Sequence, residues 1–250
     1  MGTAAQTPAP LTLTGERTLP GIADENYWFR RHEAAYLALA PFCAGAVVLE
    51  AGCGEGYGAA LLAGRGSRVL ALDYLPDVVH HVRSAYGGLS VVQGDLQRLP
   101  LATGAVEAVA TLQVVEHLHD QPGFVAECAR VLRPAGTLLV TTPNRLTFSP
   151  DAAGPVNPFH TRELSAGELA GLLSPAFAVT RLLGLRHGRR IERWEKRHGA
   201  IVEAQLTTPP DGWHPTLRGF VARLTARDFV VGLDDVDRSL DLLAVGVRRS

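Results

Sequence analysis

Three glycines that directly follow a short apolar run constrain the fold of this chain more than any other feature. Residues 46–49 are typical of a buried strand, Gly52, Gly54 and Gly56 come next, and residues 57–63 are helix-like. Glycine permits positive φ angles and lets a ligand lie against the backbone, because no Cβ is in the way. This order predicts the first unit of an open α/β sheet, in which ligands bind beyond the carboxyl ends of the strands.

Apolar runs and helix-like segments keep alternating along the chain. The predicted strands are residues 46–49, 68–72, 89–92, 106–112, 137–141, 177–185 and 242–247, and the predicted helices are residues 24–41, 57–63, 76–86, 122–132 and 165–173. Such alternation favours a parallel sheet that is covered by helices. We therefore predict an α/β fold: a doubly wound, Rossmann-like, mostly parallel sheet of seven strands with helices on both faces.

The length of the chain favours one domain. Its 250 residues, 46% of them hydrophobic, can bury a sizeable core. We predict a flexible N-terminal tail over residues 1–23 and a single domain over residues 24–250. Residues 189–237 break the alternation, since they hold Trp194, Trp213, three prolines and many charges before the last strand. We expect a mostly helical insertion there, beside the substrate pocket.

The charge balance and the cysteines exclude several classes of protein. A formal net charge of −1 gives no global field that would attract nucleic acid or an anionic membrane. Cys43, Cys53 and Cys128 lie far apart without a CxxC spacing, which fits neither a disulfide framework nor a zinc cluster. The first residues do not resemble a signal peptide, and no stretch approaches the roughly 20 apolar residues that span a bilayer. We expect a cytoplasmic protein, and its oligomeric state cannot be predicted.

The glycine turn alone leaves two ligand classes open. Gly54, Gly56 and Ala59 match the G-x-G-x-x-A variant of a dinucleotide site. Glu50 argues against that ligand, because a carboxylate just before the glycines would repel a pyrophosphate, whereas it can serve a ligand with an amino group and a sulfonium. S-adenosylmethionine is such a ligand, and we predict it as the cofactor.

Two further acids follow the next two predicted strands. Asp73 closes the second strand, where an acid can accept hydrogen bonds from both hydroxyls of a ribose. Asp95 lies in Gly94-Asp95-Leu96, directly after the third strand, and could bind the amino group of an adenine.

These motifs together resemble a class I S-adenosylmethionine-dependent methyltransferase over roughly residues 25–185. The motifs are E-A-G-C-G-E-G, the Asp73 strand end, G-D-L, V-V-E-H-L and L-R-P-A-G-T-L-L-V-T-T-P-N. The family usually has P-G-G where this chain has P-A-G. The resemblance implies cofactor contacts at Glu50, Gly52, Cys53, Gly54, Asp73, Tyr74, Gly94, Asp95, Leu96 and Gln113.

Four other segments resemble an actinobacterial subgroup of this family that is associated with methylated, glucan-type polysaccharides. They are T-G-E-R-T-L-P, E-N-Y-W-F-R-R-H, N-R-L-T-F-S-P and N-P-F-H-T-R-E-L. The resemblance implies O-methylation of a sugar or oligosaccharide hydroxyl. Another small acceptor (a secondary metabolite or a quinone-like compound), an NAD-dependent oxidoreductase and a non-catalytic cofactor-binding protein remain as alternatives.

Two histidines are candidates for the general base that would take the proton of an attacking hydroxyl. His117 follows the fourth predicted strand, and His160 lies in the loop after the fifth. In some related small-molecule O-methyltransferases, E-x-x-E-H holds a divalent metal. Gln113 replaces the first acid of that pattern here, and an amide is a poorer ligand than a carboxylate, so we predict no metal.

Four residues are candidates for contacts with the acceptor. Tyr27 and His32 lie on the N-terminal helix, where an aromatic ring could stack on a sugar or simply belong to the core. Asn144 and Arg162 follow the fifth predicted strand, and Arg162 could hold a sugar or phosphate group. The basic run over residues 181–198 could bind an anion, but is interpreted as a solvated face.

Overall fold

A computed structural model describes residue 11 and residues 17–150 and 154–250 of the chain. Most of the predicted N-terminal tail therefore lies outside the described residues. Its last part packs against the rest of the molecule: Thr18 and Leu19 are buried, and the Thr18 hydroxyl lies 3.3 Å from the hydroxyl of Tyr57.

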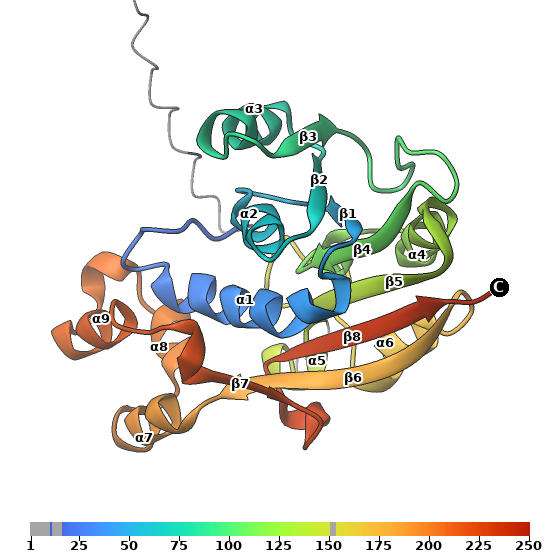
Figure 1. Cartoon of the computed structure of the whole chain (residues 1–250). Helices are drawn as coiled ribbons and strands as arrows, with labels where there is room; N and C mark the ends of the chain where they lie inside the picture. Colours follow the sequence, from blue (N-terminus) through green and yellow to red (C-terminus); the bar gives the residue numbers. More distant parts are fainter. Residues whose placement is uncertain (1–10, 12–16, 151–153) are drawn as a thin grey trace, which may run out of the picture.

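One mixed sheet organises the molecule (Figure 1). Its strands are β1 (Val47–Ala51), β2 (Arg68–Asp73), β3 (Ser90–Gln93), β4 (Val106–Leu112), β5 (Leu132–Pro143), β6 (Phe177–His187), β7 (Phe229–Gly232) and β8 (Asp241–Arg248). They lie in the order β3-β2-β1-β4-β5-β8-β6-β7. Strands β1 to β5 pair in parallel, whereas β8 is antiparallel to both β5 and β6, and β7 is antiparallel to β6. The predicted α/β class and the mostly parallel sheet are confirmed.

The predicted number of seven strands is wrong, because the sheet of the described residues has eight. The additional strand is β7, which lies inside the predicted insertion and pairs with residues 184–187 at the end of β6. Its sequence, F-V-V-G, is short and follows the charged segment A-R-D, so the sequence offered little signal for it. Strand β6 is also longer than predicted, since it continues to His187.

Helices cover both faces of the sheet, as predicted (Figure 1). They are α1 (Asn26–Leu39), α2 (Tyr57–Gly64), α3 (Pro76–Ala85), α4 (Gln121–Val131), α5 (Arg145–Phe148), α6 (Ala166–Leu173), α7 (Arg189–His198), α8 (Ile201–Leu206) and α9 (Pro215–Val221). Side chains alternate between the two faces along a strand. Val48 of β1 therefore packs in one core with α1, α2 and α3, and Leu49 packs in the other core with α4 and α6.

Local signals explain where several helices begin. Pro76 fits the first turn of α3, where its missing N–H costs no hydrogen bond. Ser165 and Glu168 form a capping box before α6: the Ser165 hydroxyl accepts from the Glu168 N–H at 3.3 Å, and the Glu168 carboxylate accepts from the Ser165 N–H at 2.8 Å. These contacts satisfy N–H groups that have no partner within the helix.

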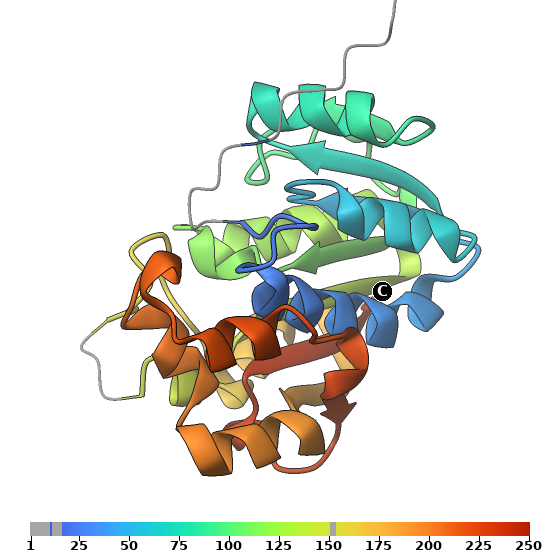
Figure 2. The same cartoon turned by 90° about the vertical axis from the view of Figure 1, so that its left-hand side faces the viewer.

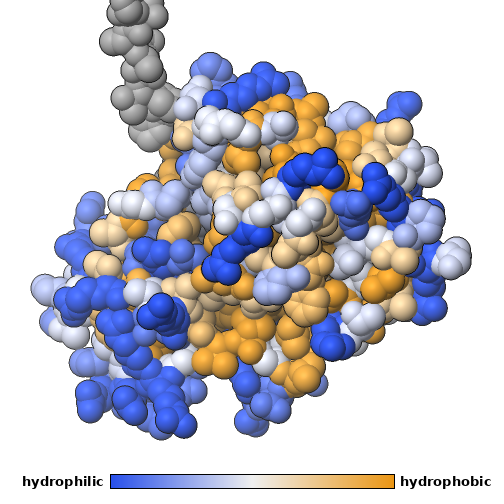
Figure 3. Space-filling model, in the orientation of Figure 1, coloured by the Kyte–Doolittle hydropathy of each residue, from blue (hydrophilic) through white to orange (hydrophobic). Residues whose placement is uncertain are grey.

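The segment between β6 and β8 is largely helical and packs beside α1 (Figure 2). Ile191 of α7, Ile201 of α8 and Val221 of α9 are fully buried, and they share a core with residues of α1. Hydrophilic side chains gather at the lower left of the face shown in Figure 3, where Figure 1 places α7. Among the described residues, no helix is long and apolar enough to span a membrane.

The order of the strands brings the predicted site residues to one edge. Strand β1 lies between β2 and β4, so the direction of winding changes on either side of it. The carboxyl ends of parallel neighbours meet at the same edge of a sheet. Glu50, Asp73 and Gln113 therefore stand at the ends of three adjacent strands or directly after them.

Candidate active site

The glycine turn after β1 is tightly bonded to the end of β2. Gly52 has a φ of +83° and Gly54 a φ of +51°, values that favour glycine. The N–H groups of Gly52 and Cys53 both donate to the carbonyl of Leu72 at 2.9 Å, and Cys53 is buried. A Cβ on Gly52 would lie 2.7 Å from Cγ2 of Val114, whereas one on Gly54 would meet nothing within 4 Å. The turn is thus packed below Gly52 and open at Gly54.

The acid at the end of β2 is bonded to this turn. One carboxylate oxygen of Asp73 accepts from the Gly54 N–H at 3.0 Å, and the other accepts from the Leu75 N–H at 3.0 Å. Two charge-assisted bonds of this kind fix the orientation of the carboxylate. Asp73, the residue predicted to bind the ribose, is therefore joined to the glycine turn by a hydrogen bond.

Glu50 is fully buried beneath the start of α2. Its Oε1 accepts from the hydroxyl of Tyr36 at 2.6 Å, and its buried Oε2 has no hydrogen-bond partner among the described residues. A Cβ on Gly58 would lie only 2.4 Å from Oε1, so the glycine makes room for the carboxyl. Burial raises the pKa of Glu50 to about 8. An unsatisfied buried oxygen of this kind suits a ligand that brings a positive charge or an N–H donor.

The segments after β2 and β3 form the outer end of the same edge. Asp95 is exposed and accepts from the Gln97 N–H at 2.8 Å, and Leu96 is half-buried beside it. The ring of Tyr74 is 66% exposed. Gly94 has no room for a side chain, because a Cβ would lie 2.9 Å from Pro100.

A cavity of about 420 Å³ opens next to this edge. Its walls come from α1, from the segments after β4 and β5, and from residues 205–213 of the segment between β6 and β8. Four predicted site residues line it: His32, Gln113, His117 and His160. The indole rings of Trp28 and Trp213 also line it.

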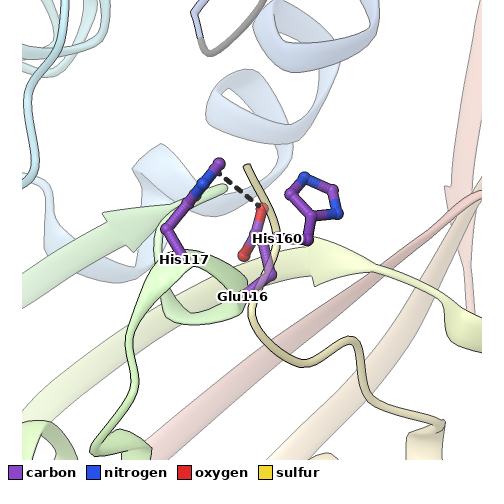
Figure 4. Close-up of side chains that lie close together, drawn as sticks. All are labelled: Glu116, His117 and His160. Carbon is purple, nitrogen blue, oxygen red and sulfur yellow. Dashed lines mark ion pairs between the residues drawn. The ribbon is translucent and has the colours of Figure 1, made fainter. Parts of the chain in front are cut away.

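Glu116, His117 and His160 turn toward one another at this cavity (Figure 4). The two imidazole rings meet edge to face with centroids 4.9 Å apart. Nδ1 of His117 lies 2.9 Å from the carbonyl oxygen of Phe159. Because a carbonyl can only accept, Nδ1 carries the proton, and Nε2 of the neutral His117 ring is the basic nitrogen.

His160 is held by hydrogen bonds at both ring nitrogens. Its Nδ1 lies 2.7 Å from Oε1 of Glu163, a buried carboxyl, and its Nε2 lies 3.1 Å from Nδ2 of Asn157. Oδ1 of Asn157 accepts from the Phe159 N–H at 3.0 Å, which orients the amide so that Nδ2 donates to His160. His160 is therefore rigidly placed, with its lone pair already engaged.

Glu116 forms the floor of the cluster. The Thr142 hydroxyl donates to its Oε2 at 2.9 Å. Within the described part of the chain Oε1 has no hydrogen-bond partner, and it lies 4.0 Å from Nε2 of His117. Burial raises the pKa of Glu116 to about 8. One ligand atom from each of Glu116, His117 and His160 lies within 4.8 Å of the others, so the three could also hold a divalent cation if His160 gave up one of its two hydrogen bonds.

An ion pair that sequence reasoning missed lies at the cavity wall, which Arg31 helps to line. Arg31 of α1 donates to both carboxylate oxygens of Asp241 in β8 at 2.6 Å, and both side chains are buried. Nε2 of Gln113 donates to the same carboxylate at 3.2 Å, and Gln113 has a left-handed φ of 57°. Two features of the sequence could have indicated this pair. Arg31 is a charge on the buried face of an amphipathic helix, and Asp241 is an acid at the start of an apolar strand.

Three predicted acceptor residues do not reach the cavity. Tyr27 is fully buried, and its hydroxyl lies 2.7 Å from Nε2 of His187. The side-chain amide of Asn144 donates to three carbonyls that precede β8, and its Oδ1 caps α5. The side chain of Arg162 is 59% exposed and pairs loosely with Glu168 at 3.8 Å. Core packing, loop anchoring and surface charge account for these positions, and none of the three lines the cavity.

His32, the fourth predicted acceptor residue, does line the cavity. Its Nδ1 lies 3.1 Å from the hydroxyl of Tyr57. Burial lowers the pKa of His32 to about 4, so the ring is neutral around pH 7. His32 can therefore offer a neutral hydrogen-bonding group to a ligand.

Known proteins resemble this chain in sequence. Residues 49–140 match the family model of a methyltransferase domain. A probable S-adenosylmethionine-dependent methyltransferase of Mycobacterium tuberculosis is 52% identical over 96% of this chain and 91% of its own length. A ubiquinone biosynthesis O-methyltransferase of Xanthomonas oryzae is 36% identical over 41% of this chain and 45% of its own.

The fold is shared with solved structures as well. An S-adenosylmethionine-dependent methyltransferase from Mesorhizobium loti superposes with a TM-score of 0.56 at 17% identity, over 91% of this chain and 99% of that one. The residues present fit the cofactor of these enzymes, since Glu50 holds an unpartnered oxygen and the turn is open at Gly54. The chain belongs to the S-adenosylmethionine-dependent methyltransferases, and S-adenosyl-L-methionine is its cofactor.

Proposed function

We propose that the enzyme transfers the methyl group to a hydroxyl oxygen of a sugar or a short oligosaccharide. The observation that carries this proposal is the basic Nε2 of His117, which lines a cavity that also presents the indoles of Trp28 and Trp213. A base is needed because the hydroxyl must lose its proton as its oxygen attacks. Aromatic faces suit the apolar faces of sugar rings.

The cofactor residues follow from the strand ends. We assign the amino group of the methionine part to the carboxyl of Glu50, directly or through water, and its backbone contacts to Gly52, Cys53 and Gly54. The carboxylate of Asp73 would accept hydrogen bonds from the ribose hydroxyls. Tyr74, Gly94, Asp95 and Leu96 would hold the adenine, and Gln113 would form the wall next to the acceptor. When bound, the cofactor supplies an electrophilic methyl group, and the protein supplies alignment.

His117 receives the proton of the acceptor. The acceptor hydroxyl would lose its proton to Nε2 of His117, and the ring would become an imidazolium. The methyl group would come from the sulfonium of the bound cofactor, whose S–C bond would break to leave a neutral thioether. The carbonyl of Phe159 holds the Nδ1–H at 2.9 Å, and Oε1 of the Glu116 carboxyl lies 4.0 Å from Nε2. His160 packs edge to face against His117 and limits its rotation.

The charge of the cavity favours a neutral acceptor. The buried guanidinium of Arg31 is matched by the carboxylate of Asp241 at 2.6 Å, so this cation is not available for an anionic group. The cation Arg17 and the acids Asp24 and Glu25 also line the cavity, so its remaining charges are of both signs, and burial raises the pKa of Glu25. A polyhydroxylated, uncharged molecule fits these surroundings better than a phosphate or a carboxylate.

The test is methyl transfer from labelled cofactor to a panel of gluco- and manno-oligosaccharides, phenols and catechols. We expect product with a glycan, with the new methyl group placed on oxygen by NMR. His117→Ala should lower kcat by about 10²- to 10⁴-fold, the usual contribution of a general base. His119→Ala is the matched control, because His119 is exposed on the same loop and does not line the cavity. Equal rates in both variants would remove His117 from this role.

A second candidate is cation-assisted methylation of a catechol-type diol. It is favoured by the 4.8 Å grouping of Glu116, His117 and His160, and the Xanthomonas oryzae relative is named as an O-methyltransferase of ubiquinone biosynthesis. Full activity after chelation and dialysis would exclude it. Loss of activity with EDTA and recovery with Mg²⁺ would favour it over simple base catalysis.

A further inference from the structure

A second cavity, of about 410 Å³, lies between α7, α8 and α9. No Asp, Glu, Lys or Arg is among the described residues that line it. The lining offers three threonine hydroxyls (Thr207, Thr208 and Thr216) and two imidazoles (His198 and His214). Uncharged donors and acceptors suit a neutral polar ligand and give no counter-charge to an anion or a cation.

The polar groups of this cavity keep hydrogen-bonding capacity for a ligand. The Thr207 hydroxyl donates to the carbonyl of Glu203 at 2.9 Å, which leaves its oxygen able to accept. Nδ1 of His214 accepts from the Thr216 N–H at 3.2 Å, so Nε2 of the neutral ring carries a proton to donate. Trp194 also lines the cavity, and its buried Nε1 has no hydrogen-bond partner among the described residues.

The aromatic walls are rigid. Trp194 stacks on Phe220 with ring centroids 5.1 Å apart and packs against His198 at 4.8 Å. The indole N–H of Trp213 donates to the carbonyl of Thr208 at 2.8 Å, which fixes the orientation of that ring. A preorganised wall loses little conformational entropy when a ligand binds to it.

The two cavities are neighbours. Trp213 lines both of them, and Leu206, which lines the first, is followed directly by Thr207, which lines the second. Leu206 is 59% exposed at the rim between them. A chain-like acceptor that leaves the first cavity over this rim would meet the second one.

We propose that the second cavity is a distal subsite that binds a further sugar unit of a linear acceptor whose reacting unit occupies the first cavity. The inference rests on the proposed function, since it extends the same acceptor site. The distal unit would hydrogen-bond to the threonines and to His214, and it would lie against Trp213. Binding energy from such a remote unit helps to position the reacting hydroxyl. The enzyme would therefore prefer oligosaccharides to single sugars.

The experiment measures binding by calorimetry and methyl transfer by label, for a methyl glucoside and a linear gluco-tetrasaccharide. The variant Thr207→Trp fills the second cavity from an exposed position, and Lys196→Trp places the same side chain on the exposed surface of α7, outside both cavities. The wild type should bind the tetrasaccharide about tenfold more tightly than the glucoside, a difference of about 1.4 kcal/mol.

Thr207→Trp should abolish that preference and leave the binding of the glucoside unchanged, which also shows that the variant is folded. Lys196→Trp should behave as the wild type. His214→Ala should weaken binding of the tetrasaccharide severalfold and should leave binding of the glucoside unchanged. Equal affinity of the wild type for the two sugars, or an equal loss of both in Thr207→Trp, would overturn the inference.

The two proposals can fail separately. Label transfer to both sugars together with equal affinities would reject the distal subsite and keep the proposed function. The tetrasaccharide could instead bind tightly, lose affinity in Thr207→Trp and receive no methyl group. That result would support the distal subsite and reject the proposed reaction. If neither sugar binds, the subsite is rejected.

Discussion

The substitution Glu50→Gln tests whether the buried acid of β1 is held protonated when no cofactor is bound. Glu50 is fully buried, with one oxygen bonded to Tyr36 and the other unpartnered. Burial raises its pKa from an ordinary value of 4.5 to about 8. Glutamine keeps the shape of the side chain and its acceptor oxygen but cannot ionise.

The direction in which stability changes with pH follows from proton binding. Between pH 4.5 and pH 8 the folded protein retains a proton on Glu50 that the unfolded chain has lost. The contribution of this group is therefore fully present below pH 4.5 and is lost as the pH rises through 8. The free energy of unfolding should fall by about 1.4 kcal/mol per pH unit because of this group, and by about 5 kcal/mol at most over the whole window.

The assay is urea unfolding of the cofactor-free protein at a series of pH values across this window. We expect the stability of Glu50→Gln relative to the wild type to rise with pH by about 1.4 kcal/mol per unit. Glu203→Gln, at an exposed carboxyl of α8, is the control and should give a constant difference. A constant difference for Glu50→Gln as well would show that the buried carboxyl is already ionised, and the reasoning from burial would be refuted.

Three further substitutions probe the frame of the site. Asp73→Ala removes a carboxylate that accepts two backbone N–H bonds beside the glycine turn, and we expect calorimetry to show S-adenosylhomocysteine binding at least about tenfold weaker; unchanged affinity would exclude the ribose role. Gly52→Ala brings a Cβ to 2.7 Å from Val114 at a positive φ, which should cost about 1–3 kcal/mol in thermal unfolding, and an unaltered Tm would contradict the crowding. Arg31→Ala leaves Asp241 buried without its partner, and urea unfolding should show a loss of about 3–5 kcal/mol; a loss below about 1 kcal/mol would mean that water reaches the carboxylate.

Strand-end reasoning recovered much of the candidate site from the sequence. An acid or a histidine that follows a predicted parallel strand must lie at the ligand-binding edge, whatever the rest of the fold does. Asp73 and Gly54 are bonded to each other, and His117 and His160, which follow neighbouring strands, have rings 4.9 Å apart. These contacts depend on topology alone, and topology is encoded in the strand and helix pattern.

Contacts that depend on which side of a helix faces the core could not be predicted in this way. Periodicity shows that Tyr27 and Arg31 share a face of α1, but not that this face meets β8 and His187. The partner of Arg31 is Asp241, 210 positions away, and nothing local marks the pair. Asn144 directly follows a parallel strand, as a ligand-binding residue would. Its side-chain amide nevertheless donates to the backbone carbonyls before β8 and does not reach the cavity.

The position of β8 has a consequence for how the enzyme can form during synthesis. This strand follows all the others along the chain, yet it lies between β5 and β6 in the sheet. Until it has been made, both neighbours have an open edge, and Arg31 has no counter-ion. A nascent chain that stops short of residue 241 lacks the carboxylate that holds Arg31 and Gln113, two residues that line the acceptor cavity. The acceptor cavity should therefore reach its final form only after β8 has joined the sheet.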